Sequence, residues 1–206
     1  MEFQLSLENG RFLVKLARKT VREYIEKQKI SEVPKNTPRK LREHCGVFVT
    51  LNKIVNKKEE LRGCIGIPYP SKPLVGGVIE SAINSALHDP RFHPVSSEEL
   101  DQITFEVSVL TPPQLVEVDN PIDYPSKIRV GQDGLIIEKG YNRGLLLPQV
   151  PIEWEWNEEE FLSQCCIKAG LPLDNWLLKE TKVYRFQAII FEEIFPNGKI
   201  EIKKLR

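Results

Sequence analysis

The chain has 206 residues, 41% hydrophobic and 28% charged, a composition typical of a globular protein that can form its own core. Its 29 basic and 29 acidic residues give a formal net charge of zero at pH 7. Nucleic acids and anionic membranes attract proteins with a positive excess, so this balance disfavours both as main partners.

The sequence also predicts the compartment. No stretch approaches the roughly 20 continuous apolar residues that span a bilayer. The N-terminus lacks the basic and then apolar pattern of a secretory signal. The four cysteines, Cys45, Cys64, Cys165 and Cys166, form no CxxC pair, so we expect reduced thiols. We therefore expect a cytoplasmic protein.

The first expected element is a helix over residues 11–28, where apolar residues recur at steps of three and four. Basic residues on its other side interleave with Glu23 and Glu26. This pattern favours a solvated face and leaves a nucleic-acid face as the alternative. Residues 31–44 are polar, contain two prolines and are typical of a loop.

A hairpin and a second helix are expected next. Two apolar runs, 47–54 and 61–67, flank a polar turn at 56–60, a pattern that predicts antiparallel strands. Pro73 suits the first turn of a helix that continues to Leu87. That helix ends at the approach to Pro90, because a residue before proline resists the helical conformation.

Residues 103–110 alternate in polarity. Apolar residues occupy the odd positions, and Thr104, Glu106 and Ser108 occupy the even ones. Side chains of a strand point alternately to its two faces, so this segment predicts a strand with one polar face. Solvent exposure of that face is one interpretation; a pocket that contains Glu106 as a general base is the other.

A small meander and a C-terminal pair of strands complete the prediction. The expected strands of the meander are 127–130, 135–139 and 145–147. Asn157 followed by three glutamates predicts the cap of a helix that stops at Gly170. The last two expected strands are 183–194 and 199–203, joined by a turn at 196–198.

Helices and strands are mixed without strict alternation, and short turns join several strand pairs. This organisation predicts an α+β fold with a mainly antiparallel sheet flanked by helices. We expect one domain, 1–206, in two lobes. The larger lobe comprises 1–112 and 180–206, and the smaller inserted lobe, about 113–179, holds the three-stranded meander and helices.

The hexapeptide Leu-Arg-Gly-Cys-Ile-Gly at 61–66 is the strongest candidate site. On a strand, Arg62 and Cys64 share a face at roughly 7 Å spacing. A fixed positive charge beside a thiol favours the reactive thiolate. Gly63 and Gly66 would let a ligand or a neighbouring element approach the backbone closely. The alternative is that Cys64 is a small core residue.

Other residues could assist this site. Asp89 and Arg91 follow the second helix, where they predict either a salt bridge at the helix end or an anion clamp made by the guanidinium. His88 and His93 are separated by a proline, so the helical spacing of metal ligands does not apply. The sequence predicts no metal site and no cofactor, and it lacks nucleotide-binding, zinc-protease and radical SAM motifs.

Residues 61–66 resemble the signature hexapeptide of the AMMECR family, named for the Alport syndrome, midface hypoplasia, mental retardation and elliptocytosis chromosomal region. Further similar segments follow in the same order through residue 171. They are 85–87, 89–92, Pro94, 99–100, 107–110, Gly131, Gly134, 147–150 and 168–171.

The resemblance, to a microbial member of the family, implies a two-lobed α+β fold with both chain ends and an antiparallel sheet in the larger lobe. It implies no established activity. Microbial relatives are encoded beside, or fused to, MEMO-like and radical SAM proteins, which implies a shared modification pathway. Carried over by position, Arg62, Gly63, Cys64 and Gly66 form the site, with Asp89 and Arg91 as neighbours.

We therefore expect an enzyme or enzyme subunit with a cleft at the hexapeptide for a small-molecule or peptide ligand. Cys64 would be its nucleophile or thiol contact, with Arg62 as activator and anion contact. The alternative is a non-catalytic interaction or adaptor module that docks a protein partner. A nucleic-acid-binding protein is the second alternative.

Overall fold

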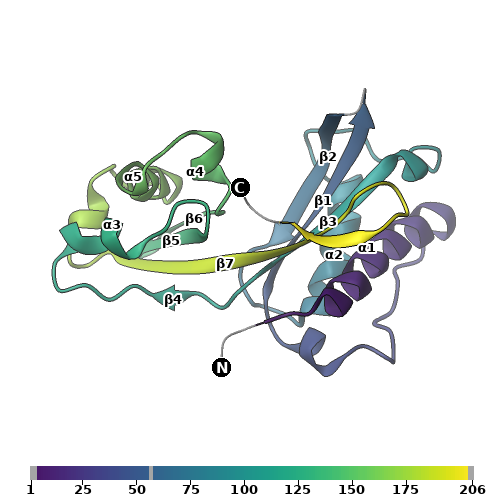
Figure 1. The fold of residues 1–206 in the computed structure, drawn as a ribbon, viewed down its shortest axis with the longest axis horizontal. Coiled ribbons are helices and arrows are strands. Elements are labelled where there is room, and N and C mark those ends of the chain that lie inside the picture. Colours follow the sequence, from purple (N-terminus) through teal and green to yellow (C-terminus); the bar gives the residue numbers. More distant parts are fainter. Residues whose placement is uncertain (1–3, 56–57, 204–206) are drawn as a thin grey trace. The chain divides into compact units, whose positions relative to one another are not determined.

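A computed structural model describes residues 4–55 and 58–203, which form two compact units (Figure 1). Of these residues, unit 1 holds 4–110 and 189–203, and unit 2 holds 111–188. Strand β7, Lys182–Glu193, contributes to the sheets of both units as the chain passes from one to the other. Strands and helices are mixed and the strand pairs are antiparallel, so the α+β prediction is confirmed.

Unit 1 begins with helix α1, Leu7–Lys27, which starts four residues before the expected position. The reason is a capping box. The Ser6 hydroxyl accepts a hydrogen bond from the Asn9 amide at 3.2 Å, and the Asn9 side chain accepts one from the Ser6 amide at 3.2 Å. These bonds satisfy backbone donors that the first turn would otherwise leave unpaired.

The hairpin and the second helix of unit 1 are confirmed. Of the expected turn at 56–60, residues 58–60 belong to a strand, and residues 56–57 lie outside the described residues. The expected loop at 31–44 includes one 3-10 turn, Arg39–Arg42. The main elements are β1 Gly46–Val55, β2 Lys58–Ile67, α2 Leu74–Leu87, β3 Ile103–Leu110 and β8 Ile200–Lys203, with a 3-10 turn at Leu100–Gln102 before β3.

Both long helices of unit 1 pack on one face of its sheet. The strand order is β2-β1-β3-β7, and β8 pairs with the end of β7. Helix α2 packs on β1 and β2, and α1 packs on β3, β8 and α2. Alternate residues of β1 and β3 supply the centre of this core: Val47, Val49, Leu51, Ile103, Phe105, Val107 and Val109.

The opposite face of β3 differs from its simplest prediction. Thr104, Glu106 and Ser108 lie on the polar face, as the alternation indicates, but all three are buried rather than solvated. Every residue of this strand, which lies between β1 and β7 in the sheet, is buried. Solvent exposure of this polar face is therefore wrong.

In unit 2 the first strand of the expected meander is wrong. Residues 127–130 form no strand, because helix α3 ends at Lys127 and a turn follows. In that turn the Asp133 carboxylate accepts a hydrogen bond from the Arg129 amide at 3.0 Å. The elements of unit 2 are β4 Gln114–Leu115, α3 Tyr124–Lys127, β5 Asp133–Lys139, β6 Asn142–Leu146, α4 Val150–Glu153 and α5 Glu158–Lys168, with 3-10 turns at Pro121–Asp123 and Asn175–Leu177.

Helix α5 follows its sequence signals. The Asn157 side chain accepts a hydrogen bond from the Glu160 amide at 2.9 Å, and the Glu160 carboxylate accepts one from the Asn157 amide at 2.9 Å. Gly170, just past the end, has a φ of +74°, which suits glycine. Cys165 and Cys166 are free and buried in the core of unit 2, as expected of core thiols. Within 4–55 and 58–203, no helix is both long and apolar enough to cross a membrane.

A buried ion pair joins α1 to the end of β7 within unit 1. Arg18 donates from Nε to the Glu193 carboxylate at 2.7 Å and also pairs with it through Nη2. Its Nη1 donates to the Leu100 carbonyl at 3.0 Å, and its guanidinium lies 4.6 Å from the centre of the Phe105 ring. The side chains of Arg18 and Glu193 are only 9% and 3% exposed. Each charge has lost its hydration on burial, and the attraction of the opposite charge offsets that loss.

We expect Arg18→Met to lower the free energy of unfolding by about 3–5 kcal/mol, because it leaves the Glu193 carboxylate buried without its cation. Guanidinium denaturation followed by circular dichroism measures the change. Arg22→Met is the matched control. Arg22 lies at the surface of the same helix and pairs with the exposed Asp101, so its loss should cost less than about 1 kcal/mol. Equal losses in both variants would contradict the assigned role of the buried pair.

Candidate functional site

The outer edge of β2 is the centre of the candidate site. Strand β2 is an edge strand of the unit 1 sheet, so no strand satisfies the outward backbone groups of Cys64. Two side chains from the segment after α2 take that place. The Asp89 carboxylate accepts a hydrogen bond from the Cys64 amide at 2.8 Å, and Arg91 Nη2 donates to the Cys64 carbonyl at 3.1 Å.

Asp89 and Arg91 are bound to each other as well. Arg91 donates from Nε and Nη2 to the two carboxylate oxygens of Asp89, at 2.9 and 2.7 Å. The Arg91 guanidinium and the amides of Cys64 and Arg91 hold the pKa of the Asp89 carboxyl far below its usual range. The side chain of Asp89 is 1% exposed and that of Arg91 is 52% exposed. The expected salt bridge is confirmed, and the anion-clamp role of Arg91 stays a prediction.

The Cys64 side chain is partly buried, and its sulfur favours the protonated, neutral form. Burial raises its pKa above the ordinary value of a thiol. The Thr50 hydroxyl, which donates to Cys64 Sγ at 3.3 Å, and the Arg91 charge act in the opposite direction, while the carboxylates of Glu106 and Asp89 add to the increase. Burial is the largest of these effects, so the free protein favours the thiol over the thiolate.

The expected activation of Cys64 by Arg62 is not what the structure shows. Arg62 Nε and Nη2 donate to the Glu99 carboxylate at 3.2 and 2.9 Å, and Nη2 also donates to the His93 carbonyl at 2.9 Å. The positive charge that lowers the pKa of Cys64 is that of Arg91. The register of the β1–β2 pairing shifts between Leu51 and Asn52. Strict two-residue alternation therefore fails at this point of the strand.

Gly63 and Gly66 serve internal packing, and their expected contact with a ligand stays a prediction. A Cβ on Gly63 would lie 2.1 Å from the Ser85 carbonyl oxygen of α2. A Cβ on Gly66 would lie 2.4 Å from the Phe48 ring. The two glycines thus let α2 and the side chain of Phe48 approach β2. The neighbouring-element interpretation is the one that the geometry supports.

Glu106 lies in the same row of the sheet as Cys64. Thr50 is opposite Cys64 in the β1–β2 pairing and opposite Glu106 in the β1–β3 pairing, so the three side chains share one face. Glu106 is engaged by Lys203 of β8, whose ammonium lies 2.7 Å from one carboxylate oxygen and 2.9 Å from Glu192. Its expected role as a general base is untested.

The sequence did not predict a role in this site for four of its residues: Thr50, Ser85, Glu99 and Lys203. Ser85 accepts a hydrogen bond from the Ile65 amide at 2.8 Å and donates to the Val49 carbonyl at 2.7 Å, tying α2 to both strands of the hairpin. Ser85 and Glu99 fall in segments that resemble the family, which was the available signal. Lys203 had none, because its partners lie far away along the chain.

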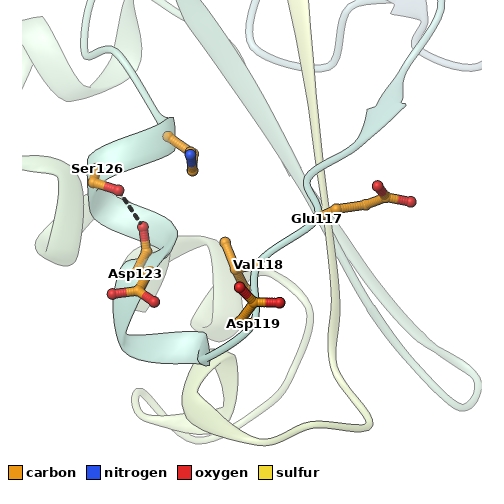
Figure 2. A pocket seen from close by; sticks show the side chains of 6 residues that line it. Glu117, Val118, Asp119, Asp123 and Ser126 are labelled. Atoms are coloured by element: carbon orange, nitrogen blue, oxygen red, sulfur yellow. Dashed lines mark hydrogen bonds between the residues drawn. The ribbon is translucent and has the colours of Figure 1, made fainter.

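A separate pocket of about 340 Å³ lies in unit 2, where Figure 2 shows its acidic lining. It is lined by Glu117, Val118, Asp119, Asp123, Ser126 and Lys127, none of which belongs to the expected site. Across the part of the chain that the structure describes, no group of three or more His, Cys, Asp or Glu side chains could hold a metal ion.

Comparison with known proteins identifies the family. A family model described as AMMECR1 matches residues 14–191. The chain belongs to the AMMECR1 family. The match includes the hexapeptide and every expected site residue, so the resemblance is confirmed at the level of the family.

Archaeal relatives match the chain over nearly its full length. A protein from Thermococcus kodakarensis is 57% identical over 204 residues, covering 98% of this chain and 99% of that protein. One from Methanothermobacter thermautotrophicus is 57% identical over 189 residues, 92% and 96% of the two chains. The crystal structure of an uncharacterised Pyrococcus horikoshii protein has a TM-score of 0.85 and 56% identity, covering 96% of this chain and 98% of that one. The Pyrococcus horikoshii protein shares the fold of this chain, and the names of the three relatives state no activity.

We expect Gly63→Ala to lower the free energy of unfolding by at least about 1–3 kcal/mol, because the new methyl group would force α2 away from β2. Gly76→Ala is the matched control. Nothing lies within 4 Å of the position that a Cβ would take at Gly76, and alanine favours helix, so it should stabilise α2 by up to about 1 kcal/mol. Thermal unfolding compares the two. A neutral Gly63→Ala would contradict the close contact with Ser85.

We expect the rate of Cys64 alkylation by iodoacetamide to rise only above the pH at which an ordinary thiol ionises, since burial raises its pKa. Arg91→Gln should shift the pH profile further upward, because it removes the cation that lowers the pKa. Arg62→Gln should leave the profile in place. Peptide mass spectrometry across pH 7–11 measures the rate at Cys64 alone. A low pKa of Cys64 in the wild type that rises in Arg62→Gln would instead support activation of the thiol by Arg62.

Proposed function

We propose that this AMMECR1-family protein is a cytoplasmic enzyme or enzyme subunit that binds a small-molecule or peptide ligand beside Cys64. Arg91 supplies an anion contact and Cys64 a thiol contact. The supporting observation is the placement of a half-exposed guanidinium on the backbone of a partly accessible cysteine, held there by a carboxylate that is almost completely buried.

The hydrogen bonds of Arg91 leave one side of the guanidinium available. Nε and Nη2 are engaged by Asp89 and the Cys64 carbonyl. Among the described residues, no hydrogen bond involves Nη1. A carboxylate or phosphate oxygen of a ligand would meet a cation whose position is already fixed, so little side-chain entropy would be lost on binding.

The raised pKa of Cys64 favours a thiol contact over a resident thiolate nucleophile. Nucleophilic attack would require the ligand, or a partner protein, to shift this ionisation by removing water or adding positive charge. Glu106 and Thr50 lie in the same row and would accept or pass a proton only after such a change. Arg62, paired with Glu99, positions the segment after α2.

The second candidate is a non-catalytic interaction module. It is favoured by Gly63 and Gly66, whose close contacts are filled by the protein itself. Its proposed partners are MEMO-like and radical SAM proteins, as the family resemblance implies. Nucleic acid is a weaker candidate partner, since the chain has no net charge.

The two proposals differ in the response of Cys64 to simple anions. We expect inorganic phosphate, pyrophosphate or succinate to change the alkylation rate of Cys64 saturably at pH 9. Arg91→Gln should abolish this effect, since the oxyanion loses its cation. Arg22→Gln, which removes a surface charge elsewhere in unit 1, should preserve it. Alkylation followed by peptide mass spectrometry is the measurement.

An unchanged rate with all three anions would contradict the ligand-site proposal. Co-purification with a MEMO-like or radical SAM protein, lost on Arg91→Gln, would then support the interaction module. Retention of the anion effect in Arg91→Gln would place the binding elsewhere on the protein.

A further inference from the structure

Two tryptophans stack at the turn between α4 and α5 in unit 2. The ring centres of Trp154 and Trp156 lie 6.0 Å apart, with an angle of 18° between the planes. Trp156 is half-buried and packs against the core of unit 2. Trp154 rests on it and is 66% exposed. A large aromatic surface is thus held rigidly in water, where a side chain of this kind is uncommon.

The backbone of this turn is fixed in an unusual conformation. Glu155, between the two tryptophans, has a φ of +55°, a left-handed region that non-glycine residues rarely adopt. The Trp156 amide donates to the Pro151 carbonyl at 2.8 Å, and the Glu155 amide donates to the Ile152 carbonyl at 3.2 Å. These two bonds form the C-terminal cap of α4, a usual way for a helix to end, and the cap brings the two indoles together.

The charged residues of the segment that holds the pair have one sign. Residues 153–160 include five glutamates, and no lysine or arginine occurs between Arg143 and Lys168. Glu153, Glu155 and Glu159 are exposed. Although the chain as a whole is neutral, this exposed segment is acidic, and acidic side chains attract positively charged groups.

We infer that the Trp154–Trp156 pair and its surrounding glutamates form a docking surface for a lysine- or arginine-rich segment of a partner protein. A guanidinium or ammonium group would lie on the exposed face of the Trp154 indole, where cation–π attraction is strongest. The glutamate carboxylates would pair with the flanking basic residues. Tryptophan commonly supplies much of the binding energy of an interface. This surface belongs to unit 2, and the inference does not depend on the proposed function.

The probe is a fluorescein-labelled peptide of alternating arginine and glycine, titrated with the full chain and followed by fluorescence anisotropy. We expect Trp154→Ala to weaken binding about tenfold, and Trp154→Phe to weaken it less, because phenylalanine keeps an aromatic face. Tyr141→Ala is the matched control. Tyr141 is a fully exposed aromatic residue of unit 2 outside the acidic segment, so its loss should leave binding unchanged.

The charge contribution is tested in the same assay. Glu153→Gln with Glu159→Gln should weaken binding and reduce its dependence on salt, since fewer charges are paired. A peptide with glutamate in place of arginine should not bind. Circular dichroism checks that each variant is folded, which we expect because Trp154, Glu153 and Glu159 are exposed.

Wild-type affinity in Trp154→Ala, or equal binding of the acidic peptide, would overturn the inference. Self-association of the wild-type protein that Trp154→Ala abolishes would also overturn it, because the occupant would then be a second copy of this chain. Sedimentation velocity without the peptide distinguishes that outcome.

Discussion

The candidate site depends on how an edge strand is completed. Strand β2 has no neighbour on its outer side, and its backbone at Cys64 would otherwise present an unpaired amide and carbonyl. Asp89 and Arg91 satisfy both groups with side-chain atoms. A neighbouring strand would have done the same with backbone atoms, but it would have covered the thiol and supplied no charge. Side-chain completion therefore leaves a cation and a cysteine at an accessible edge.

This arrangement also explains the behaviour of the thiol. The cation that lowers the pKa of Cys64 is Arg91, and the carboxylates of Glu106 and Asp89 act against it. Burial then decides the balance in favour of the neutral form. The ionisation of Cys64 is thus set first by burial, and the nearby charges act on it in opposite directions.

Buried charged side chains of unit 1 form ion pairs. Arg18 with Glu193 and Lys203 with Glu106 each place a cation against a carboxylate at the sheet. Paired charges of this kind add specificity of placement more than net stability, because each ion gives up its hydration. In unit 2 the contrast is the acidic turn at Trp154, where carboxylates gather at the surface without basic residues nearby in the chain.

The sequence by itself determined the family, the α+β class and most elements, because apolar periodicity and caps such as Asn157 are local signals. It failed at residues 127–130, where a carboxylate four residues away formed a turn, and at the start of α1, where the Ser6 cap was overlooked. Strand alternation alone was the basis for predicting that Arg62 and Cys64 lie side by side. The folded structure alone shows that Arg62 pairs with Glu99, that Arg91 bonds to the Cys64 carbonyl, and that the buried Glu106 pairs with the partly exposed Lys203. Those contacts join residues up to 97 positions apart, and no local pattern records which distant charge will fill a given buried position.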